Sequence, residues 1–364
     1  MTEKNKKTIY DIALRAGASP STVSAALNGT WKKRRIAQAT AERIIGIAND
    51  DGYSANLQAR ALRTSRSGLV ALLMPEYNRF FSNIAQTFSR EVRARNQCPI
   101  IISTERNPDE ERATVADLTS WSIDALFFVG SVAPEELSLQ CQAAEIPHVF
   151  VDQPCALAPS VITDNRNGAR ILTQEISRSM MRLAGGIGTG PRDTIYFLGG
   201  DRSLPSTRNR VAGFSDEMIA QFGRLDPGQV LATTYDMDVA TQTISDLYER
   251  LGGLPRGLFI NSDSVFEGAL RFLATLPEDE LNACAFGCFD YEPFGQLLRF
   301  PVHMIRQRHK MLVQRAFALL ESNSPPVIEQ VQPEIYRAGV MTGQATVVPI
   351  RPGAASSGEI TNPV

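Results

Sequence analysis

The apolar positions near the start of the chain recur at helical spacing and divide into three short segments. They predict one helix from Thr8 to Gly17, a second that begins at Ser19-Pro20, and a third over Ala39 to Asp50. The third helix is expected to complete a small core with Ile44, Ile45, Ile47 and Ala48. Because a glycine-containing turn joins the first two helices, the pattern predicts a helix-turn-helix, whose second helix is suited to the DNA major groove.

From residue 69 onward, short apolar runs alternate with helical stretches. Strands are expected at 69–74, 99–102, 125–129, 148–151, 195–198, 258–260 and 285–289. Helices are expected to include 84–95, 113–121, 211–222 and 266–276. The alternation predicts parallel sheets covered on both faces, and the strands are too many for one compact sheet. We therefore expect two doubly wound lobes with a ligand site between them, at the carboxyl ends of the strands.

The charge is distributed unevenly along the 364 residues. Residues 1–66 hold 12 Lys and Arg against 5 Asp and Glu, whereas the remainder holds 25 against 34, so a net charge of -2 conceals a basic start and an acidic body. A basic unit of this kind indicates a polyanionic partner, although basic termini are also found as solvated tails.

The residues of the first segment resemble the headpiece of the lac-repressor (LacI/GalR-type) family of transcription regulators. The resemblance rests on the ordered elements Ile9-Tyr10-Asp11-Ile12-Ala13, Ala16-Gly17-Ala18-Ser19, Ser21-Thr22-Val23-Ser24, Leu27-Asn28-Gly29, Thr40 and Gly52-Tyr53. The loop between Asn28 and Thr40 is similar to that of the fructose- and sucrose-repressor branch. The resemblance implies an all-α headpiece at 1–53, a hinge helix at 54–66 and a periplasmic-binding-protein-like α/β core at 67–344. The Pro-, Gly- and Ser-containing segment 345–364 is expected to be a disordered tail.

In that family the headpiece binds a palindromic operator in double-stranded DNA as a homodimer. Carried over to this chain, the DNA-contacting positions are Thr8, Tyr10, Ser19, Pro20, Ser21, Thr22 and Ser24, with Ala25 on the outer face of the second helix. The basic run Lys32, Lys33, Arg34 and Arg35 is expected to meet phosphates, and its alternative is a solvated loop. In the hinge the resemblance adds Asn56, Ala59 and Leu62, the last as a leucine wedge in the minor groove, and Ala55 stands where the family usually has proline.

The same resemblance places a small-molecule effector, a sugar or sugar phosphate, in the cleft of the core. Its expected contacts are Phe81, Asp152, Arg210, Asp263 and Asp290. A phosphate usually needs more than one cationic donor, and no second arginine is evident beside Arg210, so a neutral sugar is favoured. Arg79 keeps the phosphorylated alternative open.

Other classes of protein find less support in the sequence. The 5 cysteines are scattered and the 3 histidines lack metal-ligand spacing, so no metal site is expected. The sequence contains no nucleophile motif and no phosphate-loop motif, so we expect no enzymatic activity and no cofactor. No apolar run could span a membrane, and no signal peptide is evident, which indicates the cytoplasm. The alternative is a solute-binding protein or sugar-modifying enzyme with an incidental basic start.

Overall fold

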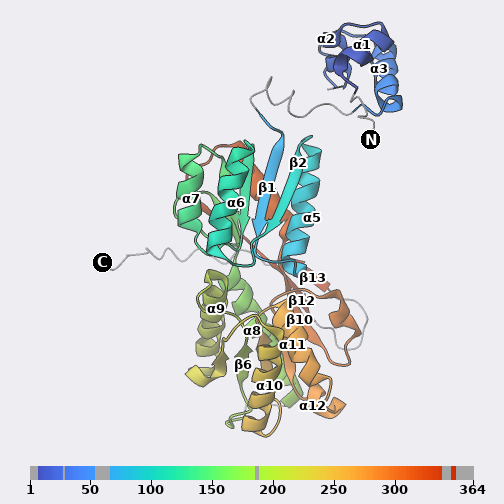
Figure 1. The fold of residues 1–364 in the computed structure, drawn as a ribbon. Helices are drawn as coiled ribbons and strands as arrows, with labels where there is room; N and C mark the ends of the chain where they lie inside the picture. Colours follow the sequence, from blue (N-terminus) through green and yellow to red (C-terminus); the bar gives the residue numbers. More distant parts are fainter. Residues whose placement is uncertain (1–6, 28, 54–65, 185–187, 338–345, 350–364) are drawn as a thin grey trace, which may run out of the picture. The chain divides into compact units, whose positions relative to one another are not determined.

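The computed structural model describes residues 7–27, 29–53, 66–184, 188–337 and 346–349. The chain divides into two compact units, residues 1–68 and residues 69–364, and each is described separately (Figure 1). The predicted hinge at 54–66 and most of the predicted tail lie outside the described residues.

The first unit contains the three predicted helices: α1 (Ile9–Ala16), α2 (Pro20–Leu27) and α3 (Gln38–Asp50). Thr8 caps α1 in a reciprocal capping box with Asp11, and Gly17 ends the helix in the left-handed region at φ 56°. The core formed by the three helices is small, and its fully enclosed members include Ile12, Val23 and Ile44. The prediction that Ile45 belongs to this core was wrong, because its side chain is 37% exposed.

The second unit contains two sheets, and the first is entirely parallel. Its strand order is β11-β5-β4-β3-β1-β2. The strands are β1 (Leu69–Met74), β2 (Cys98–Ser103), β3 (Ala125–Val129), β4 (His148–Val151), β5 (Ser160–Thr163) and β11 (Ile328–Val331).

The second sheet is parallel except at one edge. Its order is β13-β12-β10-β9-β8-β6-β7, and β12 pairs antiparallel with both β10 and β13. The strands are β6 (Ile195–Leu198), β7 (Val230–Leu231), β8 (Gly257–Ile260), β9 (Ala285–Cys288), β10 (Val302–Arg306), β12 (Glu334–Arg337) and β13 (Thr346–Pro349). Two predictions are thereby corrected. This sheet is mixed, whereas a parallel sheet was predicted. The segment predicted to be a disordered tail includes strand β13, which pairs with the otherwise free edge of β12.

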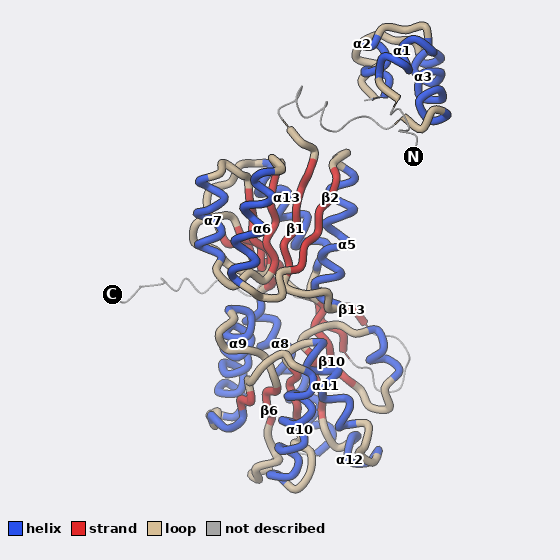
Figure 2. Tube along the Cα trace, viewed as in Figure 1, coloured by secondary structure: helices blue, strands red, loops and turns tan. Residues whose placement is uncertain are grey.

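Helices cover both faces of each sheet, as Figure 2 shows for the two lobes. They are α5 (Arg79–Ala94), α6 (Pro108–Ser120), α7 (Pro134–Ala143), α8 (Asn165–Ala184), α9 (Pro205–Phe222), α10 (Met237–Leu251), α11 (Asp263–Leu273), α12 (Glu278–Asn282) and α13 (His309–Glu321). Helices α5 and α13 bury one face of the first sheet, and α6 and α7 bury the other. Helices α10 and α11 cover one face of the second sheet, and α8 and α9 cover the other. The core is therefore two doubly wound lobes, as predicted.

Within the described residues, the chain passes between the lobes three times: after β5, after β10 and after β11. The three crossings are hydrogen-bonded to one another. Thr163 Oγ1 donates to Gln307 Oε1 at 2.7 Å, and Gln332 Nε2 donates to Asp164 Oδ2 at 2.6 Å. These bonds join the segments about which the two lobes would move relative to each other.

Helices α8 and α9 pack closely because a glycine lies at their contact. A Cβ atom at Gly213 would overlap the backbone carbonyl oxygen of Arg166. We expect Gly213→Ala to cost roughly 1–3 kcal/mol through overpacking, which a thermal melt would show as a lower Tm. Gly46→Ala in α3 is the control, because nothing lies within 4 Å of its added methyl group and the substitution should not lower Tm. Equal melting of Gly213→Ala and the unchanged protein would contradict this packing.

Candidate functional site

The residues predicted to contact DNA lie mostly on the surface of the first unit. Tyr10 is 71% exposed, and Thr8, Ser19, Pro20 and Ser21 are also exposed. Thr22 and Ser24 are half-buried. The Ser19 hydroxyl accepts from the Thr22 backbone N–H at 3.2 Å, so it satisfies one of the orphan donors at the start of α2. These positions present small hydroxyl groups around the first turn of α2.

Ala25 was predicted on the outer face of α2, and this was wrong. Its side chain is 3% exposed, and its carbonyl oxygen accepts hydrogen bonds from the backbone N–H and the hydroxyl of Thr30. The turn after α2 therefore folds back over this position, and Ala25 belongs to the core of the unit.

The basic run forms an exposed turn between α2 and α3. Lys32, Lys33, Arg34 and Arg35 are all exposed, and the Lys32 ammonium lies 5.2 Å from the centre of the Trp31 ring. Backbone hydrogen bonds from Arg34 to Thr30 and from Arg35 to Lys32 fold this segment into consecutive turns. Four adjacent cations are thus presented on an ordered loop. The predicted hinge contacts Asn56, Ala59 and Leu62 lie outside the described residues.

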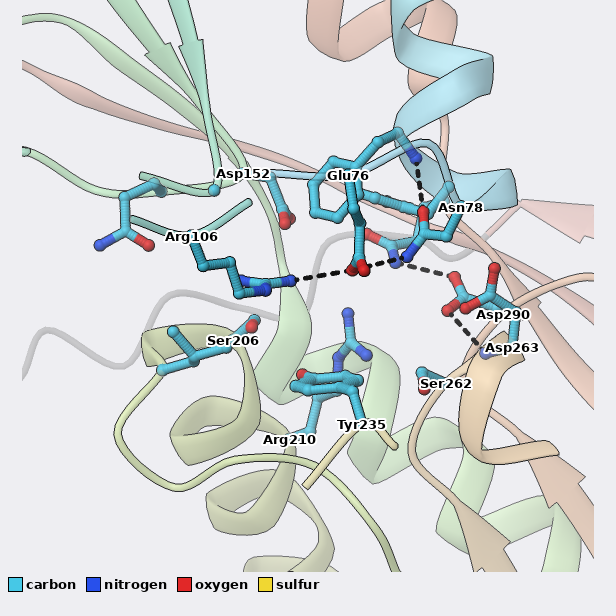
Figure 3. Close-up of a pocket in the computed structure, with 16 residues that line it drawn as sticks. Glu76, Asn78, Arg106, Asp152, Ser206, Arg210, Tyr235, Ser262, Asp263 and Asp290 are labelled. Atoms are coloured by element: carbon cyan, nitrogen blue, oxygen red, sulfur yellow. Dashed lines mark hydrogen bonds and ion pairs between the residues drawn. The ribbon is translucent and has the colours of Figure 1, made fainter. Parts of the chain in front are cut away.

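In the second unit, one pocket collects side chains from the carboxyl ends of strands in both sheets (Figure 3). All five predicted effector contacts line it: Phe81, Asp152, Arg210, Asp263 and Asp290. Phe81 and Asp152 come from the lobe of the first sheet, and the other three come from the second lobe. Their role in binding remains a prediction, but the structure brings them to one place.

Arg210 is buried although it carries a charge, and hydrogen bonds hold its side chain in place. Its side chain is 3% exposed, its Nε donates to Asn165 Oδ1 at 2.8 Å, and one terminal nitrogen donates to the Asn261 carbonyl at 2.6 Å. The guanidinium lies 3.9 Å from the centre of the Phe289 ring, close enough for a cation–π contact. Figure 3 shows the guanidinium pointing upward into the pocket. A planar donor fixed in this way is suited to oriented oxygen atoms of a ligand.

Asp290 lies at the centre of a buried chain of hydrogen bonds. Gln307 Nε2 donates to its Oδ1 at 2.8 Å, and the Asp263 backbone N–H donates to its Oδ2 at 3.2 Å. Burial, followed by the neighbouring Asp263 carboxylate, raises the pKa of Asp290 well above its usual value, and Arg210 opposes this rise. Asp290 is therefore bonded directly to one crossing between the lobes, at Gln307, and through Gln307 it is connected to a second crossing, at Thr163.

Asp152 follows β4 in a left-handed backbone conformation at φ 62°, which few residues other than glycine, asparagine and aspartate adopt. Its Oδ1 is buried and accepts no hydrogen bond from any described residue. Burial raises the pKa of Asp152 to about 6, against the opposing influence of Arg210 and then Arg106. The side chain therefore keeps an acceptor available to a ligand.

Arg106 is the main pocket residue that the sequence reasoning missed. It lies in the loop after β2 at φ 56°, lines the pocket, and donates to Glu76 Oε1 at 3.3 Å. The expectation that Arg210 has no arginine companion was therefore wrong. Arg79, the predicted second cation, instead forms an ion pair with Glu292 at 2.8 Å and does not line this pocket.

Further polar groups complete the wall of the pocket. Asn78 caps α5 by accepting from the Phe81 N–H at 3.0 Å, and its amide donates to Glu76 at 3.2 Å. On the opposite lobe, the Tyr235 hydroxyl lies 2.8 Å from that of Thr207. The pocket is therefore rich in carboxylate, amide and hydroxyl groups, with the apolar ring of Phe81 beside them. Among the described residues, no three His, Cys, Asp or Glu side chains could hold a metal ion together.

Comparison with known families finds one match in each of the two units. Residues 8–56 match the family described as bacterial regulatory proteins, lacI family, and residues 67–276 match the periplasmic binding proteins and sugar binding domain of LacI family. The chain belongs to the LacI family. It is a DNA-binding transcription regulator. The two family matches confirm the predicted resemblance, and they favour this function over the solute-binding alternative. Within the described part of the chain, no helix is long and apolar enough to cross a membrane.

Two LacI-family relatives are similar over most of their length. The ribitol operon repressor of Klebsiella aerogenes is 41% identical over 219 residues, which are 60% of this chain and 79% of the relative. The sucrose operon repressor of Klebsiella pneumoniae is 31% identical over 322 residues, which are 86% of this chain and 91% of the relative. The second relative agrees with the predicted fructose and sucrose branch.

A solved structure shares the fold of the core. The Cra transcriptional dual regulator from Pseudomonas putida, in complex with fructose 1-phosphate, superposes with a TM-score of 0.65 at 22% identity, over 75% of this chain and 99% of that chain. This similarity supports the two-lobed core of the LacI family.

Proposed function

We propose that this regulator is an operon repressor whose operator binding is switched by a neutral, polyhydroxylated molecule, a sugar or sugar alcohol, bound in the pocket of Figure 3. The observation that carries this proposal is the acidic composition of the pocket wall. Its described lining contains four carboxyl groups, those of Glu76, Asp152, Asp263 and Asp290, of which Asp290 has a raised pKa, against the two arginines Arg106 and Arg210. Carboxylates accept hydrogen bonds from hydroxyl groups, whereas they repel a phosphate.

The names of the relatives point in the same direction. Ribitol and sucrose are both neutral and rich in hydroxyl groups, and the names of the two relatives connect their operons with these compounds. The fructose 1-phosphate of the Pseudomonas putida regulator represents the phosphorylated alternative. We favour the neutral class because each arginine of this pocket already faces a carboxylate of the same pocket.

The coupling between ligand and DNA would act through the lobes. A ligand that touches Asp152 on one lobe and Arg210 and Asp290 on the other stabilises one relative position of the lobes over another. We further propose that the protein acts as a homodimer in the cytoplasm, because two headpieces are needed to read a palindromic operator, and that it binds its effector without converting it.

The test begins with the full-length protein and a DNA site selected from a random duplex library. Thermal-shift and calorimetric titrations would then compare ribitol, arabitol, sucrose, fructose and fructose 1-phosphate, because a ligand of the native state raises Tm with its concentration. We expect a neutral member of this panel to bind and to change the affinity for the selected site. Binding of fructose 1-phosphate alone, or a bound ligand without any influence on DNA affinity, would refute the proposed function.

A further inference from the structure

An ion pair joins the two lobes outside the three crossings. Arg79 is the first residue of α5 in the first lobe, and its Nε lies 2.8 Å from Oε2 of Glu292, which follows β9 in the second lobe. The Arg79 guanidinium also lies 5.9 Å from the centre of the Phe294 ring. Phe81 follows Arg79 by two residues, and Asp290 precedes Glu292 by two. The pair therefore lies on two segments that form the pocket of Figure 3, although neither partner lines that pocket.

The two partners are buried to very different extents. The side chain of Glu292 is 1% exposed, whereas that of Arg79 is 49% exposed. Burial raises the pKa of Glu292 to about 7, Arg79 opposes this rise, and the carboxyl groups of Asp263 and Glu267 on α11 add to it. The Glu292 carboxylate thus depends on a cation that belongs to the other lobe.

A cavity of about 640 Å³ borders the ion pair, between α5 and the segment after β9. The other charged or titratable side chains of its wall are Asp263, Asp290, Tyr291, Arg306, Arg308, His309, Lys310 and Glu334. Of these, Arg306 and Arg308 lie 4.0 and 3.5 Å from the Glu334 carboxylate, and burial lowers the pKa of His309 to about 4. The ion pair therefore bridges a loosely packed seam between the lobes.

We propose that Arg79 is a positioning residue for effector binding, because as the counter-ion of Glu292 it allows the two lobes to come together. When the lobes separate, α5 withdraws the cation and water reaches the carboxylate. When they approach, the carboxylate loses this water and gains Arg79. Removal of Arg79 alone leaves a buried charge without compensation, whereas removal of both charges is far less costly.

The part of this inference that concerns the effector rests on the proposed function. An effector that contacts both lobes binds the arrangement in which they are together, so its apparent affinity falls with the population of that arrangement. Arg79 would thus change effector affinity without touching the effector.

A double-mutant cycle tests whether the two charges act together. Full-length protein, Arg79→Ala, Glu292→Gln and the double variant would be titrated with ribitol, arabitol, sucrose and fructose at pH 8.5, above the pKa of Glu292. We expect Arg79→Ala to weaken binding about 10-fold in the unchanged background and less than ~2-fold beside Glu292→Gln. The loss should shrink at pH 6, where Glu292 is protonated, whereas a packing role of the Arg79 side chain would not depend on pH. Arg79→Lys keeps the charge and should recover part of the affinity.

A second measurement needs no ligand. Spin labels at Ala116→Cys on α6 and Glu249→Cys on α10, both exposed positions, would report the distance between the lobes by pulsed electron paramagnetic resonance. The exposed Cys98 would be changed to serine, and dilution with unlabelled chains would restrict the distances to one protomer. At pH 8.5 we expect Arg79→Ala to lengthen or broaden the distance distribution, and the added Glu292→Gln to restore it.

The control is Arg90→Ala, which removes an exposed arginine of the same helix. It should leave effector affinity and the distance between the lobes unchanged. The role of Arg79 is refuted, while the neutral-ligand function stands, if Arg79→Ala gives the same distances as Arg90→Ala, or if it weakens binding equally with and without Glu292→Gln. If no neutral ligand binds, the proposed effector class fails, and the distance between the lobes still decides the role of Arg79.

Discussion

Replacement of Arg210 by alanine should weaken effector binding on the order of 100-fold or more, since truncation of a buried, hydrogen-bonded charge typically has an effect of this size. The guanidinium is 3% exposed and fixed by Asn165, the Asn261 carbonyl and the Phe289 ring. It therefore presents its free donors to the ligand without loss of side-chain entropy on binding. Its removal also leaves Asp152 and Asp290 without their shared compensating cation.

Isothermal titration with the tightest-binding member of the ligand panel would measure this loss. Arg210→Lys keeps the charge but not the planar fork, so it should recover only part of the affinity. The matched control is Arg208→Ala, because Arg208 lies on the same helix, is exposed and does not line the pocket. An affinity of Arg210→Ala equal to that of Arg208→Ala, with both proteins folded by thermal melt, would show that Arg210 does not hold the ligand.

Much of the fold could be predicted because buried strands and amphipathic helices leave strong patterns. Strands β1, β3, β4 and β6 have the predicted bounds, since each is a short apolar run, preceded in β4 by His148. Helices α5, α6 and α9 were predicted to start several residues late. In α6 and α9 the first turn consists of proline and polar residues, such as Pro108-Asp109-Glu110 in α6. Periodicity detects the buried face of a helix and misses a polar first turn.

The site was predictable in part for a similar reason. Asp152, Asp290 and Arg210 follow or lie near buried strands, where the resemblance to the LacI family could place them. Arg106 has no such signal, because it lies in the polar loop Thr104–Asn107 and reaches the pocket through a left-handed backbone conformation that the sequence does not indicate. The error at Arg79 has the same origin, since the choice between a ligand and Glu292 as its partner depends on tertiary structure.

The headpiece shows where family resemblance and local packing disagree. Ala25 was carried over as an outward-facing residue, but Gly29 and Thr30 turn the chain back so that Thr30 bonds to the Ala25 carbonyl. With Ala25 buried, the exposed start of α2 offers only serine hydroxyls and Pro20. Such small groups can contact phosphates and base edges but add little charge. The electrostatic part of DNA affinity must therefore come largely from other residues, and the exposed cations of the loop after α2 are suited to this role.

Neutralising that loop is expected to have the largest influence on DNA affinity. The combined variant Lys32→Gln, Lys33→Gln, Arg34→Gln and Arg35→Gln removes four exposed cations that a common turn presents together. If each cation binds a phosphate, affinity for the selected site should fall on the order of 10³-fold at about 0.1 M salt, and the slope of log affinity against log salt should flatten by about 0.9 for each phosphate that is no longer neutralised. Fluorescence anisotropy over a salt series would measure both quantities.

The control neutralises four exposed arginines of the second unit, Arg182, Arg224, Arg271 and Arg299, to glutamine. It changes the net charge by the same amount, so a general electrostatic attraction to DNA would reduce affinity equally in both variants. We expect the loop variant alone to bind DNA more weakly, and to do so for selected and random duplexes alike, because phosphate contacts carry no base information. An unchanged salt slope in the loop variant would instead identify Lys32 to Arg35 as a solvated turn, and would leave the hydroxyl groups at the start of α2 and residues beyond this unit's described surface to supply the affinity.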